Sequence, residues 1–210
     1  SKNNLFKTLF AGVLLGIHFA LFFEAIKITK IANATFLGTL APLFTLFIEL
    51  FVLKRKYNRI VLIGLLFTLI GSIIILGYQF DLESKYTLGN VYAVICSICI
   101  ALALMIGERV RSQENTIVYT RTLYLSASCT LFFIAFGVNE ELTGYKFNEY
   151  LGLAFLGLVP TILGHNSIYY SIRYVSPTIA AAFPLGEPII ATIFAYFIFH
   201  EQITINIFLG

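Results

Sequence analysis

Tryptophan is absent from the 210 residues, cysteine occurs three times, and charged residues make up only 12% of the chain. Ordinary soluble domains carry about 25% charged residues. Because 59% of the residues are hydrophobic, a soluble protein of this size could not cover its apolar surface. The composition therefore predicts a polytopic, all-α integral membrane protein. Without tryptophan, the twelve tyrosines are the expected aromatic anchors at the membrane surface.

Several motifs of soluble enzymes are also missing. The sequence contains no G-x-S-x-G, no Walker loop and no G-x-G-x-x-G, and His200-Glu201 lacks the second histidine of H-E-x-x-H. Cys96 and Cys99 form a C-x-x-C, but it lies within the apolar stretch NVYAVICSICIALALMIG, which favours packed or lipid-facing thiols over redox chemistry. There is no basic patch with interleaved aromatics for nucleic acid. We expect a protein that is not an enzyme, has no cofactor and no metal, and binds no nucleic acid.

Seven apolar runs are long enough to cross a bilayer core, which takes about 20 helical residues. They lie near residues 5–26, 31–53, 59–79, 88–107, 117–138, 150–172 and 177–199. An eighth run begins near Ile203 and stops at Gly210. No basic segment followed by a small-residue cleavage site indicates a signal peptide, and the chain opens on a hydrophobic run after SKNN. We interpret it as part of a larger protein.

Basic residues divide unequally between the two sides of the predicted membrane. One side holds ten of them: Lys2, Lys7, Lys54, Arg55, Lys56, Arg59, Arg109, Arg111, Arg121 and Arg173. The other holds four: Lys27, Lys30, Lys85 and Lys146. Basic loops stay in the cytoplasm, so we expect the KRKYNR loop to be cytoplasmic.

The sequence contains a weak internal repeat. A shift of 146 residues aligns EAIKITKIANATFLGTLAPLFTLFIELFVLKRKYNRIVLIG with YSIRYVSPTIAAAFPLGEPIIATIFAYFIFHEQITINIFLG without a gap. The shift pairs Lys27 with Arg173 and Pro42 with Pro188. Five spans separate the copies, so the second copy is inverted relative to the first. Inverted repeats with interrupted helices in matching positions indicate a secondary transporter.

Glu187 stands near the middle of the last complete span. It follows Pro177 by ten residues, about 15 Å along a helix and thus near the midplane. Pro184 and Pro188 donate no N–H, which frees backbone carbonyls beside the carboxylate. A charge at this depth faces a cavity or is neutralised. The alternative is a kinked packing helix whose glutamate bonds a neighbouring side chain.

The matching span holds Pro42, but Ala41 occupies the position that corresponds to Glu187. Glu49 lies nearer the cytoplasmic end of this span. We expect it to extend toward Lys54 or Arg55 in a structural role.

The span before Pro177 carries a row of polar and aromatic residues. His165, Asn166, Tyr169, Tyr170 and Arg173 recur at spacings of three and four, which aligns them on one or two adjacent helix faces. His165 follows Pro160, a predicted kink, and lies near the membrane centre, where it either relays protons or binds a polar solute, or forms an interhelical hydrogen bond. Arg173 is expected at the cytoplasmic boundary.

The first span supplies two further candidates for the path, His18 and Glu24, which are six residues apart and so not on adjacent turns of one face. Gly12 and Gly16 form a G-x-x-x-G, which indicates close helix packing within the chain rather than dimerisation.

GHNSIYYSIRYVSP followed by GEPIIATIFAYFIFHEQIT resembles the EamA-type branch of the drug/metabolite transporter superfamily. FAGVLLGIHFALFFEAIKITKIANATFLGTLAPLF resembles the third and fourth spans of that family. The resemblance implies ten spans in two inverted five-helix repeats, of which this chain holds the third to the ninth and the start of the tenth. Residues 1–79 would complete the first repeat and residues 88–210 would form the second. KRKY and Phe199-His200 depart from the family pattern at helix ends.

These observations favour a multi-pass carrier that moves a small organic metabolite or drug-like solute across the cell membrane by alternating access. Proton coupling and oligomeric state stay open. The alternatives are a membrane-embedded enzyme and a sensor or structural subunit that transports nothing.

Substituting Glu187→Gln in the full-length protein should lower transport in liposomes, because it removes the one carboxylate predicted at the midplane. Membrane insertion should be unaffected. Unchanged transport would remove Glu187 from the mechanism.

Overall fold

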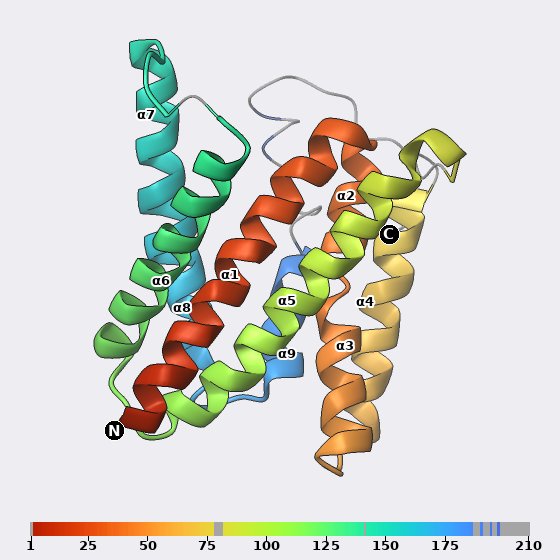
Figure 1. The fold of residues 1–210 in the computed structure, drawn as a ribbon. Coiled ribbons are helices and arrows are strands. Elements are labelled where there is room, and N and C mark those ends of the chain that lie inside the picture. The colour runs from red at the N-terminus through yellow and green to blue at the C-terminus, as the bar shows by residue number, and fades with distance from the viewer. Residues whose placement is uncertain are drawn as a thin grey trace. The chain divides into compact units, whose positions relative to one another are not determined.

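The computed structural model describes residues 2–77, 82–140 and 142–186, together with Ile190, Phe194 and Phe197. Every regular element in this part of the chain is a helix (Figure 1). The elements are α1 (Lys2–Ile28), α2 (Ile31–Gly38), α3 (Ala41–Phe47), η1 (Ile48–Val52), α4 (Arg59–Gly77), η2 (Ser84–Tyr86), α5 (Thr87–Arg111), α6 (Thr116–Gly137), α7 (Phe147–Leu156), η3 (Gly157–His165), α8 (Asn166–Ser171), α9 (Pro177–Ala182) and η4 (Phe183–Gly186).

The described part of each of the seven predicted spans contains helix. Five stretches of the described residues are long and apolar enough to cross a membrane: Lys2–Ile28, Asn33–Val52, Ser84–Arg111, Thr116–Gly137 and Phe147–Ser171. Two apolar stretches, Arg59–Gly71 and Pro177–Gly186, are shorter. The predicted eighth run, from Ile203, lies outside the described residues, as do Glu187 and Pro188.

The chain divides into two compact units. Unit 1 comprises Ser1–Ala20 and Cys99–Ala180, and unit 2 comprises Leu21–Ile98 and Ala181–Gly210. Both α1 and α5 contribute residues to each unit. The two repeats expected from sequence symmetry are a separate division of the chain and remain a prediction.

In unit 1, α1 packs closely against α6 (Figure 1). A Cβ atom at Gly12 would lie 2.5 Å from the Leu123 carbonyl oxygen and 2.5 Å from Ser126 Cβ, and Gly16 is nearly as crowded. The Ser126 hydroxyl donates to the Leu9 carbonyl at 2.7 Å. The G-x-x-x-G of this span therefore serves helix contact within the chain.

The start of α1 is also held by the connection between α5 and α6. The Asn4 amide donates to Gln113 Oε1 at 3.1 Å and to Glu114 Oε1 at 3.0 Å. The bond from Asn4 holds the pKa of the Glu114 carboxyl below its usual value, since it favours the charged form.

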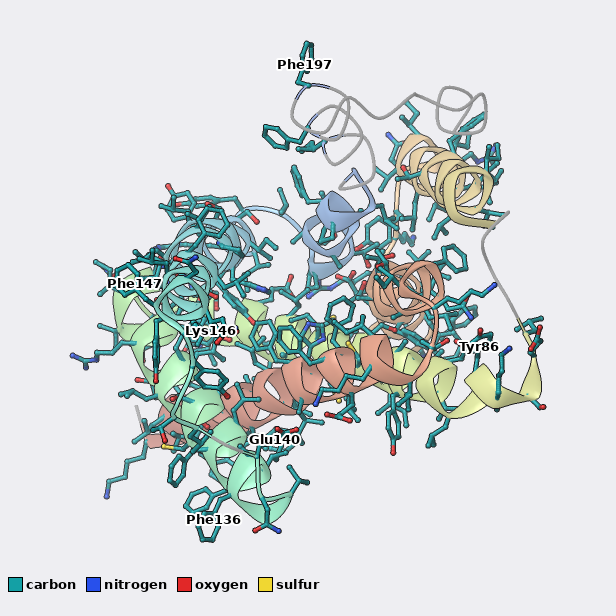
Figure 2. All side chains as sticks on the ribbon, turned by 90° about the horizontal axis from the view of Figure 1, so that it is seen from above. Tyr86, Phe136, Glu140, Lys146, Phe147 and Phe197 are labelled. Atoms are coloured by element: carbon teal, nitrogen blue, oxygen red, sulfur yellow. The ribbon has the colours of Figure 1, made fainter. Side chains whose placement is uncertain are left out.

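The Glu149 side chain caps the start of helix α7, and the side chains of this helix face outward. The Lys146 N–H donates to Glu149 Oε2 at 2.6 Å, which closes the first turn. Figure 2 shows Lys146 and Phe147 where this helix begins. No residue of Phe147–Leu156 is buried. Beyond the first turn its exposed side chains include Leu151 and Phe155, as expected of a helix in contact with lipid.

Unit 2 has a small apolar core of Ala25, Ala34 and Ala93. Beside it, Thr29 and Asn33 form a buried network with Asn90 of α5. The Thr29 hydroxyl donates to Asn90 Oδ1 at 2.8 Å, and the Asn33 amide donates to the same oxygen at 2.9 Å. This network joins the end of α1, the start of α2 and the start of α5.

Glu49 is fully buried in η1, at 0% exposure, rather than extended toward water. Arg55 folds back to it, with Nη1 at 2.6 Å from Oε1, and the Tyr57 hydroxyl donates to Oε2 at 2.6 Å. Lys54 adopts a φ of 53°, which turns the chain so that Arg55 reaches the carboxylate. The expected partner is confirmed, but the expectation that Glu49 extends outward is wrong.

Gly12→Ala should destabilise the protein by about 1–3 kcal/mol, because the new methyl group meets the backbone of α6. Thermal unfolding in detergent measures the change. Gly152→Ala on α7 is the matched control, since nothing lies within 4 Å of its Cβ position. Equal unfolding temperatures for the two variants would contradict the close packing of α1 on α6.

Candidate functional site

Pro160 locally converts the span of α7 and α8 from α-helix to π-helix. The residue lies inside η3 and has no N–H to donate to the Leu156 carbonyl, its usual partner in an α-helix. The Thr161 hydroxyl bonds that carbonyl instead, at 3.1 Å. The Asn166 N–H closes the other end of η3 by bonding the Thr161 carbonyl, five residues earlier. Interruptions of an α-helix by π-helical backbone are frequent at functional sites.

The π-helix places His165 and Asn166 at the junction of η3 and α8, where both are half-buried. The Tyr124 hydroxyl, from α6, donates to Asn166 Oδ1 at 3.1 Å and lies 3.4 Å from the Thr161 carbonyl oxygen. Tyr124 therefore ties α6 to the irregular part of the neighbouring span.

Five rings from α1, α6, η3 and α8 form what we call the aromatic cluster: Phe19, Tyr119, Tyr124, His165 and Tyr169. The His165 ring lies 5.3 Å from the Phe19 ring, edge to face, and 6.5 Å from the Tyr169 ring at an angle of 26°. Tyr169 in turn meets Tyr119 at 5.6 Å and Tyr124 at 6.5 Å, both edge to face. Such contacts stabilise aromatic pairs beyond their burial and hold the rings in place.

Two of these tyrosines are buried without a hydrogen-bond partner for the hydroxyl. Tyr119 is 1% exposed and Tyr169 is 0% exposed. Neither hydroxyl oxygen bonds another group of the structure. Buried polar groups are usually satisfied, so this pair distinguishes the cluster from ordinary aromatic packing.

Arg111, the last residue of α5, reaches the same region. Its Nε donates at 3.0 Å to the Tyr169 carbonyl, which the end of α8 leaves without a helical donor because the Arg173 N–H bonds the Tyr170 carbonyl instead. The guanidinium also donates to the Glu114 carbonyl and, at 2.5 Å, to the Thr116 hydroxyl. Arg111 thus joins the ends of α5, α6 and α8.

The structure brings together three of the six path candidates, His165, Asn166 and Tyr169. His18 lies beside them, since its ring is 5.2 Å from that of Phe19. Glu24 lies in unit 2, where it is exposed and forms an ion pair of 2.7 Å with Lys27. The sixth candidate, Glu187, lies outside the described residues.

The predicted kinks differ in form. Gly38 ends α2 and Ala41 begins α3, so the helix breaks immediately before Pro42. Pro160 lies within the π-helix, and Pro184 lies in the short 3-10 helix η4. Pro188 lies outside the described residues. Arg173 is exposed in the turn that follows α8.

Sequence reasoning missed Phe19, Tyr119, Tyr124 and the burial of Arg111. The two tyrosines of α6 are five residues apart and resemble the interfacial tyrosines expected of any membrane helix. The sequence shows that Arg111 is a positive charge at the end of a span, but this position predicts only the orientation of the chain in the membrane. Among the residues that the structure describes, no group of three or more His, Cys, Asp and Glu side chains could hold a metal.

The helices, their apolar length and their outward-facing side chains define a multi-pass α-helical protein of the cell membrane. The model of the EamA-like transporter family matches residues 1–77 and 87–210, so the chain belongs to that family.

Relatives and a solved structure agree with this assignment. An uncharacterized transporter of Clostridium kluyveri is 23% identical over 191 residues, which cover 89% of this chain and 61% of that protein. An uncharacterized transporter of Archaeoglobus fulgidus is 24% identical over 193 residues, covering 91% of this chain and 67% of that protein. The chain therefore spans about three fifths to two thirds of their length. A protein crystal structure with 15% sequence identity shares the fold, with a TM-score of 0.76 over 98% of this chain and 83% of that one.

Tyr124→Phe should destabilise the protein by about 1 kcal/mol, because it removes the bond to the half-buried Asn166 side chain. Chemical or thermal unfolding in detergent measures the loss. Tyr150→Phe, an exposed tyrosine of α7, is the matched control and should unfold like the wild type. A Tyr124→Phe variant as stable as this control would show that the bond contributes nothing.

Proposed function

We propose that this chain forms the greater part of a secondary carrier that moves a small organic solute across the cell membrane. Membership of the EamA-like transporter family supports this proposal, as do two relatives whose names describe them as transporters. The complete protein would have ten spans in two inverted repeats, of which this chain supplies seven and part of an eighth. Alternating access would arise from movement of one repeat relative to the other.

The observation that carries the proposal is the polar, irregular centre of the span Phe147–Ser171. An apolar membrane helix gains nothing from an imidazole, an amide and a broken backbone ladder, because polar groups at this depth are costly. Here Pro160 interrupts the α-helical hydrogen bonds, and His165 and Asn166 follow five and six residues later. Irregular backbone at membrane depth is tolerated where it is buried in protein or lines a water-filled cavity.

The role of each side chain would follow from its position along the span. His165, Asn166 and Tyr169 would contact the solute, with His18 beside them and Glu187 at the midplane. The breaks near Pro42, Pro160, Pro184 and Pro188 would provide the points at which helices bend. Arg173 would act at the cytoplasmic mouth, and a role for Glu24 on the path remains a prediction.

The break in the first repeat supports the inverted relationship. The backbone between α2 and α3 leaves helix just before Pro42, and the sequence repeat pairs this residue with Pro188. Paired interruptions at matching positions are a known pointer to the binding region of inverted-repeat carriers.

The direct test is reconstitution of the full-length protein in liposomes, screened for uptake of a metabolite panel with and without a pH gradient. His165→Phe should lower transport at least about tenfold, because it keeps the ring contact with Phe19 but removes both ring nitrogens. Tyr150→Phe is the control and should transport normally.

Wild-type liposomes that move no solute of the panel would contradict the carrier. Transport that survives in His165→Phe would instead exclude His165 from the path while leaving the carrier intact.

A further inference from the structure

Arg111 is a buried cation that has no carboxylate partner among the described residues. It is 1% exposed, and its three hydrogen bonds go to the Tyr169 carbonyl, the Glu114 carbonyl and the Thr116 hydroxyl, all of which are neutral. None of the ion pairs formed among the described residues includes Arg111. A buried charge is expensive without a counter-ion, so the arrangement favours the arrival of an anion.

One of the two unsatisfied hydroxyls, that of Tyr119, lies near this end of α5. Gly107 is one helical turn before Arg111 on α5, and a Cβ atom there would lie 2.8 Å from the Tyr119 hydroxyl. The guanidinium is close enough to act electrostatically on that hydroxyl. The Tyr169 ring packs on Tyr119 at 5.6 Å, while its carbonyl accepts the Arg111 bond. Groups of α5, α6 and α8 therefore meet at one place.

What this place lacks is a hydrogen-bond acceptor with negative charge. A phenolic hydroxyl can donate or accept, a guanidinium only donates, and Arg111 has five N–H groups of which three are used. An oxyanion accepts several such bonds at once, and bonds between charged partners are about twice as strong as neutral ones. A cationic ligand would meet the Arg111 charge, and a purely apolar ligand would leave both hydroxyls unsatisfied.

We propose that Arg111, Tyr119 and Tyr169 bind an oxyanion, and that the carried solute is an organic acid that presents its carboxylate to them. This inference rests on the proposed carrier function and names the class of its solute. The aromatic cluster, which shares Tyr119 and Tyr169, would hold the apolar part of the acid. Arg173 adds a second positive charge, exposed in the turn after α8 and close enough to interact with Arg111, which would attract anions to this end of the unit.

The test uses benzoate as the anionic probe and benzamide as its neutral isostere. Full-length protein in nanodiscs of phosphatidylcholine is titrated with each, and thermal unfolding reports binding. Benzoate should raise the unfolding temperature of the wild type and benzamide should not. Tyr119→Phe and Tyr169→Phe should each weaken benzoate binding at least about tenfold. Tyr150→Phe should bind benzoate like the wild type.

The ligand-free variants give an independent measurement. Because neither hydroxyl has a partner in the part of the chain that the structure describes, Tyr119→Phe and Tyr169→Phe should unfold at the wild-type temperature or above it. Loss of stability in both variants would show that the hydroxyls have structural roles and would overturn the proposal. Arg111 is left unchanged, since it also joins three helix ends.

A second set of nanodiscs, containing phosphatidylglycerol, separates the two sources of an oxyanion. If this lipid stabilises the wild type through Tyr119 and Tyr169 while benzoate has no effect, the ligand is a lipid headgroup and the assignment to the solute is wrong. Liposomes that transport other solutes but do not distinguish benzoate from benzamide would overturn the inference and leave the carrier function standing. Benzoate binding that depends on Tyr119 and Tyr169, without transport of any solute, would support the oxyanion site and contradict the carrier function.

Discussion

The absence of water in the membrane core is the constraint on which the rest of this structure depends. Each backbone N–H and C=O within the membrane must find a partner in the protein, which explains why every regular element among the described residues is a helix. The exceptions are therefore informative. Where Pro160 removes a donor, the Thr161 hydroxyl replaces it, and where α8 ends, Arg111 supplies a donor to the Tyr169 carbonyl. In both places a side chain supplies the donor that the backbone lacks.

The same constraint explains how the helices are held together. Lipid is as apolar as leucine, so burial of leucine against leucine gives little net gain within the membrane, and close contact and hydrogen bonds contribute more. Unit 1 uses Gly12 and Gly16 to bring α1 against the backbone of α6. Unit 2 uses the buried network of Thr29, Asn33 and Asn90 and a core made of alanines. Small residues and internal polar networks thus perform the role that large apolar cores perform in soluble proteins.

The sequence predicted the helices well because their signal is composition over about 20 residues, which tolerates local irregularity. It also placed His165, Asn166 and Tyr169 on adjacent faces, since helical spacing relates residues within one span. It could not predict which rings of other spans would meet them, and so it missed Phe19, Tyr119 and Tyr124. The π-helix was missed for a related reason. Proline predicts an interruption, but its form depends on which neighbouring groups satisfy the freed carbonyl.

The charged residues also show that the sequence does not predict which side chains meet in the folded protein. Arg55 and Arg111 contribute equally to the count that orients the chain, yet Arg55 neutralises the buried Glu49 while Arg111 is buried among neutral acceptors. The difference arises from tertiary structure, because only one of the two meets a carboxylate among the described residues. A buried cation of this kind lowers the free energy of unfolding, and binding of an anion can offset that loss. In a carrier such an offset is useful only if it is temporary, because a solute held by a permanently favourable site would not be released. The neutral hydrogen bonds of Arg111 stabilise the cation between binding events, so an anion would add only a modest binding free energy.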